Sequence, residues 1–117
     1  MSSRRFSWLF VLAASGCASA WSEYDDSLYR ALRAPGRESA AAHAELLGRI
    51  VGESRSAGRR PPPGILAEYG IYLARTGRAS EAKRCFEAEK EAYPESATFV
   101  AILERLTEGR RSFSPEP

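Results

Sequence analysis

From residue 22 to residue 106, apolar residues recur at spacings of three and four, and no segment alternates strictly between apolar and polar residues. Spacings of three and four place side chains on one face of an α-helix, whereas strict alternation is typical of a half-buried strand. We therefore predict an all-α fold class. The first two predicted helices cover residues 22–33 and 38–57. The second carries an apolar stripe, which consists of His43, Leu46, Leu47, Ile50 and Val51.

Proline and glycine separate the predicted helices. Pro35 and Gly36 end the first helix, and the sequence AGRRPPPG, residues 57–64, follows the second. Proline lacks a backbone N–H and its ring clashes with the preceding turn, so three successive prolines cannot continue a helix. We expect residues 57–64 to form a stiff connection between two helical parts of the chain.

A helical hairpin is predicted for residues 63–96, because this segment resembles the tetratricopeptide repeat. That repeat has the pattern W-x2-L-G-x2-Y, then A-x3-F, then P, over about 34 residues. The matching positions, which we predict to form the core of the repeat, are Leu66, Tyr69, Gly70, Leu73, Gly77, Ala82, Phe86 and Pro94. The resemblance implies two antiparallel helices that cross closely at the small residues, with glycine in the turn and proline ending the second helix. Two positions depart from the pattern: Leu66 replaces a large aromatic residue, and Glu89 replaces the usual alanine.

Only one repeat unit is visible, although such repeats need about three neighbours to bury their faces. The flanking helices must therefore cover the hairpin, which predicts a short helical array over residues 22–106. On one side we expect the helix at 38–57. On the other we expect a helix whose apolar stripe packs on the hairpin and consists of Phe99, Ile102, Leu103 and Leu106. Residues 107–117 are predicted to be a flexible polar tail.

The N-terminus has the composition of a secretory signal. Arg4 and Arg5 precede a short apolar run, residues 6–14, which is about half of the roughly 20 residues that a membrane-spanning helix needs. The sequence Ala14-Ser15-Gly16-Cys17 that follows resembles the lipobox of bacterial lipoproteins. The resemblance implies that residues 1–16 are removed, that Cys17 carries acyl chains such as palmitate, and that residues 17–21 are a lipidated tether. The alternative is an ordinary signal peptide cut after Ala18 or Ala20.

Removal of this signal would change the charge balance. The chain has 17 lysine and arginine residues against 15 aspartate and glutamate residues, and Arg4 and Arg5 leave with the signal, which contains no acid. The remaining chain has 15 of each, so composition gives no support for nucleic-acid binding. If Cys17 is acylated, Cys85 has no partner for a disulfide within its chain, and we expect it to be a buried small apolar residue.

Few residues of the sequence are candidates for catalysis or metal binding. His43 is the single histidine and lies on a predicted apolar face, while no glycine-rich phosphate loop and no cysteine–histidine metal pattern is present. Glu87, Glu89 and Glu91 spread around their helix and do not converge. We therefore expect a non-enzymatic protein without a cofactor, a metal or a small-molecule substrate. A candidate surface for a protein partner is the face of the first hairpin helix that carries Tyr72 and Arg75.

Three segments, WSEYDDSLYRAL, PPPGILAEYG and CFEAEKEAYPES, resemble a family of small uncharacterised Gram-negative lipoproteins with a tetratricopeptide-like body. Members are often encoded beside a lipoprotein that resembles the curli secretion channel. The resemblance implies an interaction module in an envelope lipoprotein assembly, with other lipoproteins, including the curli-channel-like one, as partners. Ala18 and Ser19 follow the cysteine, where aspartate commonly retains lipoproteins at the inner membrane, so we expect the outer membrane and its periplasmic face. The alternative is a structural lipoprotein that contacts peptidoglycan without a dedicated protein partner.

Overall fold

The structure is a computed structural model, and it describes residues 19–111. In this range the chain is helical and contains no strand, which confirms the predicted all-α class. A short 3₁₀ helix, η1 (Ala20–Glu23), leads into α1 (Tyr24–Arg33), and α2 (Arg37–Ser56) follows. The hairpin helices are α3 (Ile65–Arg75) and α4 (Ala79–Ala92). A second 3₁₀ turn, η2 (Pro94–Ser96), precedes the last helix, α5 (Ala97–Arg111).

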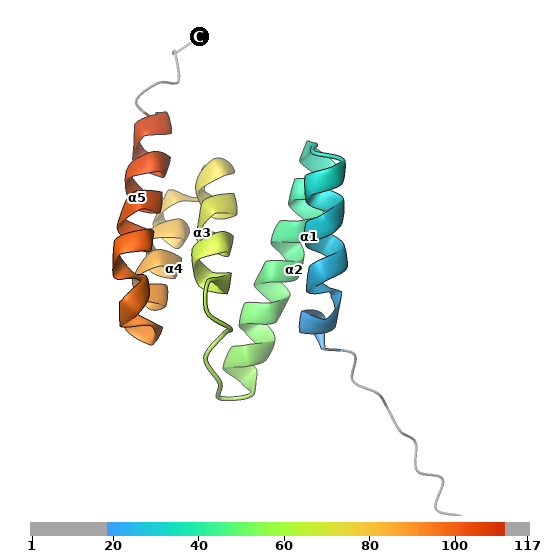
Figure 1. Cartoon of the computed structure of the whole chain (residues 1–117), viewed down its shortest axis with the longest axis horizontal. Coiled ribbons are helices and arrows are strands. Elements are labelled where there is room, and N and C mark those ends of the chain that lie inside the picture. The colour runs from blue at the N-terminus through green and yellow to red at the C-terminus, as the bar shows by residue number, and fades with distance from the viewer. Residues whose placement is uncertain (1–18, 112–117) are drawn as a thin grey trace, which may run out of the picture.

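The helices alternate in direction and form a row with α1 and α2 at one side and α5 at the other (Figure 1). Each helix contacts its neighbours in sequence, and α5 also contacts α3. The predicted stripe of α2 is confirmed, because all five of its residues are buried. The apolar core also contains residues of α3, α4 and α5, namely Ile65, Leu66, Ala67, Leu73, Ala82, Cys85, Phe86 and Val100.

The turn between α3 and α4 is short because Gly77 takes a backbone conformation that other residues avoid. Its φ angle is +81°, in the left-handed region. The N–H of Gly77 donates to the carbonyl of Ala74, and the N–H of Arg78 donates to the carbonyl of Leu73. These two bonds make a Schellman motif, which satisfies the last carbonyl groups of α3 and reverses the chain.

The two hairpin helices approach most closely where Gly70 of α3 faces Phe86 of α4. A Cβ atom placed on Gly70 would lie 2.7 Å from Cε1 of Phe86, which is closer than carbon atoms can pack. Glycine at this position therefore lets the phenylalanine ring lie directly against the α3 backbone. This is the close crossing that the sequence predicts for residues 63–96.

The predicted face of α5 is wrong. Val100 is fully buried and Leu103 packs against the core, but Phe99, Ile102 and Leu106 are 53%, 49% and 63% exposed. The inward face of α5 has Glu104 and Thr107 beside Val100, so α5 meets the hairpin through a face that is only partly apolar. The physical reason is that α5 has apolar residues on more than one face, and packing against the hairpin buries the face of Val100 and leaves the face of Phe99, Ile102 and Leu106 in solvent.

The predicted domain limits, 22 and 106, also need correction. The folded body begins two residues earlier, because Ala20 opens η1 and is buried. Helix α5 continues to Arg111, five residues past the predicted end of the domain at residue 106, and Thr107 and Glu108 still line its contact with α4. None of the helices between residues 19 and 111 is long and apolar enough to cross a membrane.

Candidate functional site

The predicted repeat core is largely brought together by the α3–α4 hairpin. Leu66, Gly70, Leu73, Ala82 and Phe86 are buried, Gly77 lies in the turn, and Pro94 begins η2 directly after α4. Tyr69 differs, because it is half-buried and its hydroxyl lies near α2, 3.1 Å from where a Cβ on Gly48 would be. Tyr69 therefore joins the hairpin to α2 and does not fill the space between α3 and α4.

Glu89, which departs from the repeat pattern, has a structural role at the start of α3. Its side chain is fully buried, and its Oε1 atom accepts a hydrogen bond of 2.7 Å from the backbone N–H of Gly64. Gly64 is the residue that precedes α3, where free N–H groups and the helix dipole favour a negative charge. The Oε2 atom has no hydrogen-bond partner within residues 19–111. Glu89 thus caps one hairpin helix from the other.

A partly buried polar network, formed by Tyr24, Ser27, His43 and Glu68, joins the first three α-helices. The fully buried His43 of α2 lies 2.7 Å from Glu68 Oε1 through Nε2 and 2.8 Å from Ser27 Oγ through Nδ1. Tyr24 of α1 donates its hydroxyl proton to the other Glu68 oxygen at 2.7 Å. Burial, and then the hydrogen bond to Glu68, raise the pKa of Tyr24, so that its phenol stays protonated and remains a donor. Since α1 buries none of its residues fully, these bonds help to hold α1 in place.

Sequence reasoning missed this network, although one signal was present. Glu68 is the single acid in ILAEYGIYLAR, a segment that is otherwise apolar apart from Arg75 at its end, so it needed a partner once α3 was packed. Ser27, His43 and Glu68 are also the residue types of a hydrolytic triad. Ser27, however, lies within α1, where backbone N–H groups donate to the helix itself, and a nucleophilic serine needs such groups free for the oxyanion. The geometry therefore favours a structural role over catalysis.

The predicted partner surface, Tyr72 and Arg75, adjoins this network. Tyr72 is half-buried, with its ring edge-on to His43 at a centroid distance of 5.5 Å, and burial raises the pKa of its phenol. Arg75 is exposed, and its guanidinium lies 5.9 Å from the Tyr72 ring centroid. Arg75 is thus open to a partner, whereas Tyr72 presents only part of its ring and also packs against the body.

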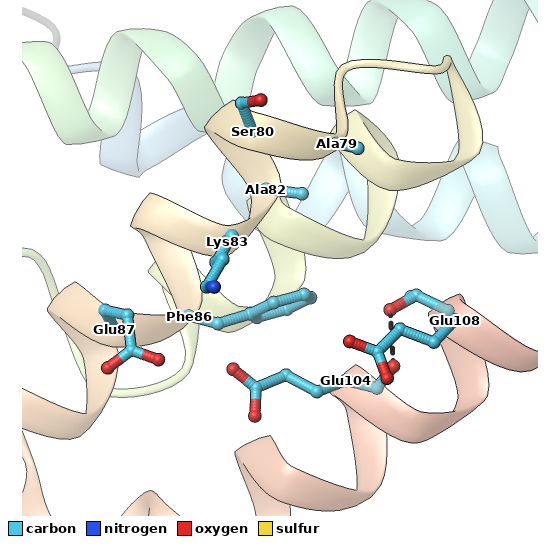
Figure 2. Close-up of a pocket in the computed structure, with 9 residues that line it drawn as sticks. Ala79, Ser80, Ala82, Lys83, Phe86, Glu87, Glu104 and Glu108 are labelled. Atoms are coloured by element: carbon cyan, nitrogen blue, oxygen red, sulfur yellow. Dashed lines mark hydrogen bonds between the residues drawn. The ribbon is translucent and has the colours of Figure 1, made fainter.

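A groove of about 480 Å³ runs between α4 and α5 (Figure 2). Phe86 forms part of its floor, and its charged walls come from Lys83 and Glu87 on α4 and from Glu104 and Glu108 on α5. Lys90 donates to Glu87 at 2.8 Å and to Glu104 at 3.4 Å, which links the two helices across the groove. These ion pairs indicate that the groove belongs to the contact between α4 and α5.

The exposed apolar residues of α5 form a continuous stripe, which we call the α5 stripe and which consists of Phe99, Ile102 and Leu106. Spacings of three and four place these side chains on one face of the helix. They lie on the last helix of the row, with no further helix between residues 19 and 111 to cover them. A helical array normally ends in a polar outer face, so the α5 stripe is the surface that most resembles an interface.

The remaining predicted sites concern cysteine and metal. Cys17, the predicted signal peptide (residues 1–16) and the last six residues lie outside the described part of the chain. Cys85 is a buried free thiol, as expected, and burial raises its pKa. Within the described range, no group of three or more histidine, cysteine, aspartate or glutamate side chains could hold a metal ion.

Comparison with known proteins identifies one family. Comparisons with curated proteins and with solved structures find no match. The profile of a family described as a domain of unknown function matches residues 19–103, which extend from the start of the folded body into α5. This range includes the polar network, the hairpin and the first part of the α5 stripe. The chain therefore belongs to this family, the domain of unknown function DUF4810.

Proposed function

We propose that this protein is a lipid-anchored, non-enzymatic interaction module, held by acylated Cys17 at the periplasmic face of the outer membrane. The observation that carries this proposal is the α5 stripe, an exposed apolar face on the last helix of the helical array. An array of this kind is stabilised by neighbours that stack on it, so the partner supplies a helix that covers the α5 stripe. The partner is another envelope lipoprotein, and the curli-channel-like lipoprotein implied by the sequence resemblance is the first candidate.

Anchoring both partners in one membrane favours this kind of association. Two proteins confined to a surface meet at a high effective concentration, so a modest interface suffices. The three side chains of the α5 stripe expose only part of their area, which fits a modest interface. Arg75, at the end of α3, is a second position where a partner can make contact.

The anchor is tested by metabolic labelling with a fatty acid. Cys17→Ser should abolish labelling and release the protein from the membrane fraction. Cys85→Ser is the matched control, because it removes the other cysteine, which is buried, and it should leave labelling unchanged. Continued labelling of the Cys17→Ser variant would show that the lipid, if any, is attached elsewhere and would overturn the proposed anchor.

The partner surface is tested by photo-crosslinking in intact cells. A photoreactive amino acid at Ile102 should give one discrete crosslinked species that contains an envelope lipoprotein, whereas the same group at Arg84, an exposed position on α4, should not. Ile102→Asp should reduce the association at least tenfold while the circular dichroism spectrum stays helical. Recovery only with peptidoglycan, and with no protein species at Ile102, would favour the structural lipoprotein instead.

A further inference from the structure

We propose that one end of the folded body lies directly on an anionic phospholipid surface, with Trp21 in the headgroup region and Arg55 and Arg59 against lipid phosphates. This proposal rests on the proposed acylation of Cys17 and adds an orientation to it. The surface is the end of the molecule formed by η1 and by residues 57–64, the connection between α2 and α3 (Figure 1). We call it the anchor end.

The first observation is where the folded body starts. The Ala20 side chain is 1% exposed, and its backbone N–H donates a hydrogen bond of 2.9 Å to Glu53 on α2. The chain is thus fixed to the body from Ala20 onward. Cys17 lies three residues earlier, and three peptide units span at most about 11 Å. An acylated Cys17 therefore keeps Ala20 within about 11 Å of the lipid headgroups, and the contacts of the folded body decide how closely η1 approaches them.

The second observation is the residue placed there. Trp21 follows Ala20, is 48% exposed, and stacks on Tyr24 with ring centroids 5.1 Å apart. The stacking fixes the indole ring on the body while leaving part of it open. Tryptophan favours the membrane–water interface, since its ring is apolar and its N–H needs a polar partner.

The third observation is the charge at the anchor end. Arg55, in the last turn of α2, and Arg59, in the connection, are exposed, and neither side chain makes a hydrogen bond or an ion pair in the described body. Two nearby carboxylates are engaged, that of Glu53 by the N–H of Ala20 and that of Glu23 by Arg49. Asp25 and Asp26 lie in the first turn of α1, and the connection contacts the end of α4 through the hydrogen bond from Arg60 to the carbonyl of Ala92. Free guanidinium groups beside a lipid anchor are suited to anionic headgroups.

The orientation can be measured by fluorescence of the acylated protein in vesicles of phosphatidylethanolamine and phosphatidylglycerol. Of the two tryptophans in the chain, Trp8 precedes Cys17 and leaves with the predicted signal, so Trp21 is then the only one. Its emission should be quenched by a nitroxide on the lipid headgroup. The control is Trp21→Phe combined with Leu32→Trp, because Leu32 is 72% exposed at the opposite end of α1, about 16 Å away along the helix. Quenching of Trp21 should exceed that of the control at least twofold.

The arginine contacts are tested by charge reversal in the same vesicles. Arg55→Glu with Arg59→Glu should reduce the quenching of Trp21 at least twofold, because acylation keeps the protein on the membrane while the anchor end turns away. Lys83→Glu with Arg84→Glu makes the same change of charge on α4 and should leave the quenching unchanged.

The outcomes separate this inference from the function it rests on. Mass spectrometry of the purified protein reports acyl chains on Cys17 independently of any orientation. An acylated protein whose Trp21 is quenched no more than the control overturns this inference alone, and equal effects of the two charge reversals overturn the role of the arginines. A Cys17 that carries no acyl chain overturns both the anchor and the orientation.

Discussion

The contact between Gly70 and Phe86 predicts that replacing glycine by alanine destabilises the protein at Gly70, whereas the same replacement at Gly52 stabilises it. Replacing glycine by alanine inside a helix normally stabilises it by about 0.8–1 kcal/mol, because glycine is the more flexible residue. Gly52, in α2, is such a position, since a Cβ there would meet no atom within 4 Å. Gly52→Ala should therefore stabilise the protein by about 0.5–1 kcal/mol.

Gly70→Ala should destabilise the protein. The new Cβ would lie 2.7, 2.9 and 3.1 Å from three ring atoms of Phe86, against an ordinary separation of about 3.5–4 Å. The ring is 3% exposed and cannot turn into solvent, so the two helices must separate. Overpacking of this kind costs about 1–3 kcal/mol. After the gain in helix propensity is subtracted, the free energy of unfolding should fall by roughly 1 kcal/mol, and by at most about 2 kcal/mol.

Thermal and urea unfolding of the protein from residue 18 onward, which retains every described residue, would measure both effects. A loss of about 1 kcal/mol lowers the midpoint of a domain of this size by about 4–8 °C. In a Phe86→Leu background, which lacks the ring, Gly70→Ala should lower the free energy of unfolding by less than it does when Phe86 is present. If Gly70→Ala raises the midpoint as Gly52→Ala does, the close crossing of α3 and α4 is wrong.

Three further predictions concern side chains that are buried or partly buried. Phe86→Ala should lower the free energy of unfolding by about 3–5 kcal/mol, and a loss below about 1 kcal/mol in a urea titration would contradict its position in the core. Tyr24→Phe removes the hydrogen bond to Glu68 and should lower the free energy of unfolding by about 1–2 kcal/mol. Tyr29→Phe, at an exposed position, should change it by less than about 0.5 kcal/mol, and equal effects of the two variants would contradict a stabilising role of the network. Cys85 should react with an alkylating reagent far more slowly in the native protein than in urea. Because folding raises its pKa, deprotonation favours unfolding, so stability should fall as the pH rises above about 9; a constant stability there would contradict the burial of the thiol.

The helical class and the stripe of α2 could be read from the sequence, because the periodicity of apolar residues is a local property. The same holds for the turn at Gly77, where glycine permits a left-handed backbone, and for the break at residues 57–64, where proline cannot continue a helix. The small residue at Gly70 was also predictable, since the repeat pattern relates it to a ring in the following helix. These features depend on neighbours in the chain or on a spacing within one hairpin.

Other features depend on how helices meet, and periodicity cannot specify this. The stripe of α5 was visible in the sequence, yet tertiary packing turned Val100 inward and left Phe99 and Ile102 in solvent. A helix with apolar residues around much of its circumference can present more than one face, and the shape of the hairpin selects which one is buried.

The polar network is the clearest case of a feature decided by the tertiary structure. Ser27 and Glu68 are separated from His43 by 16 and 25 residues in the sequence. They meet because packing of α1, α2 and α3 brings the three side chains within hydrogen-bond distance. Sequence alone identified His43 as a residue on a buried face. Its two partners followed only from the packing, because a buried imidazole must find hydrogen bonds wherever the neighbouring helices provide them.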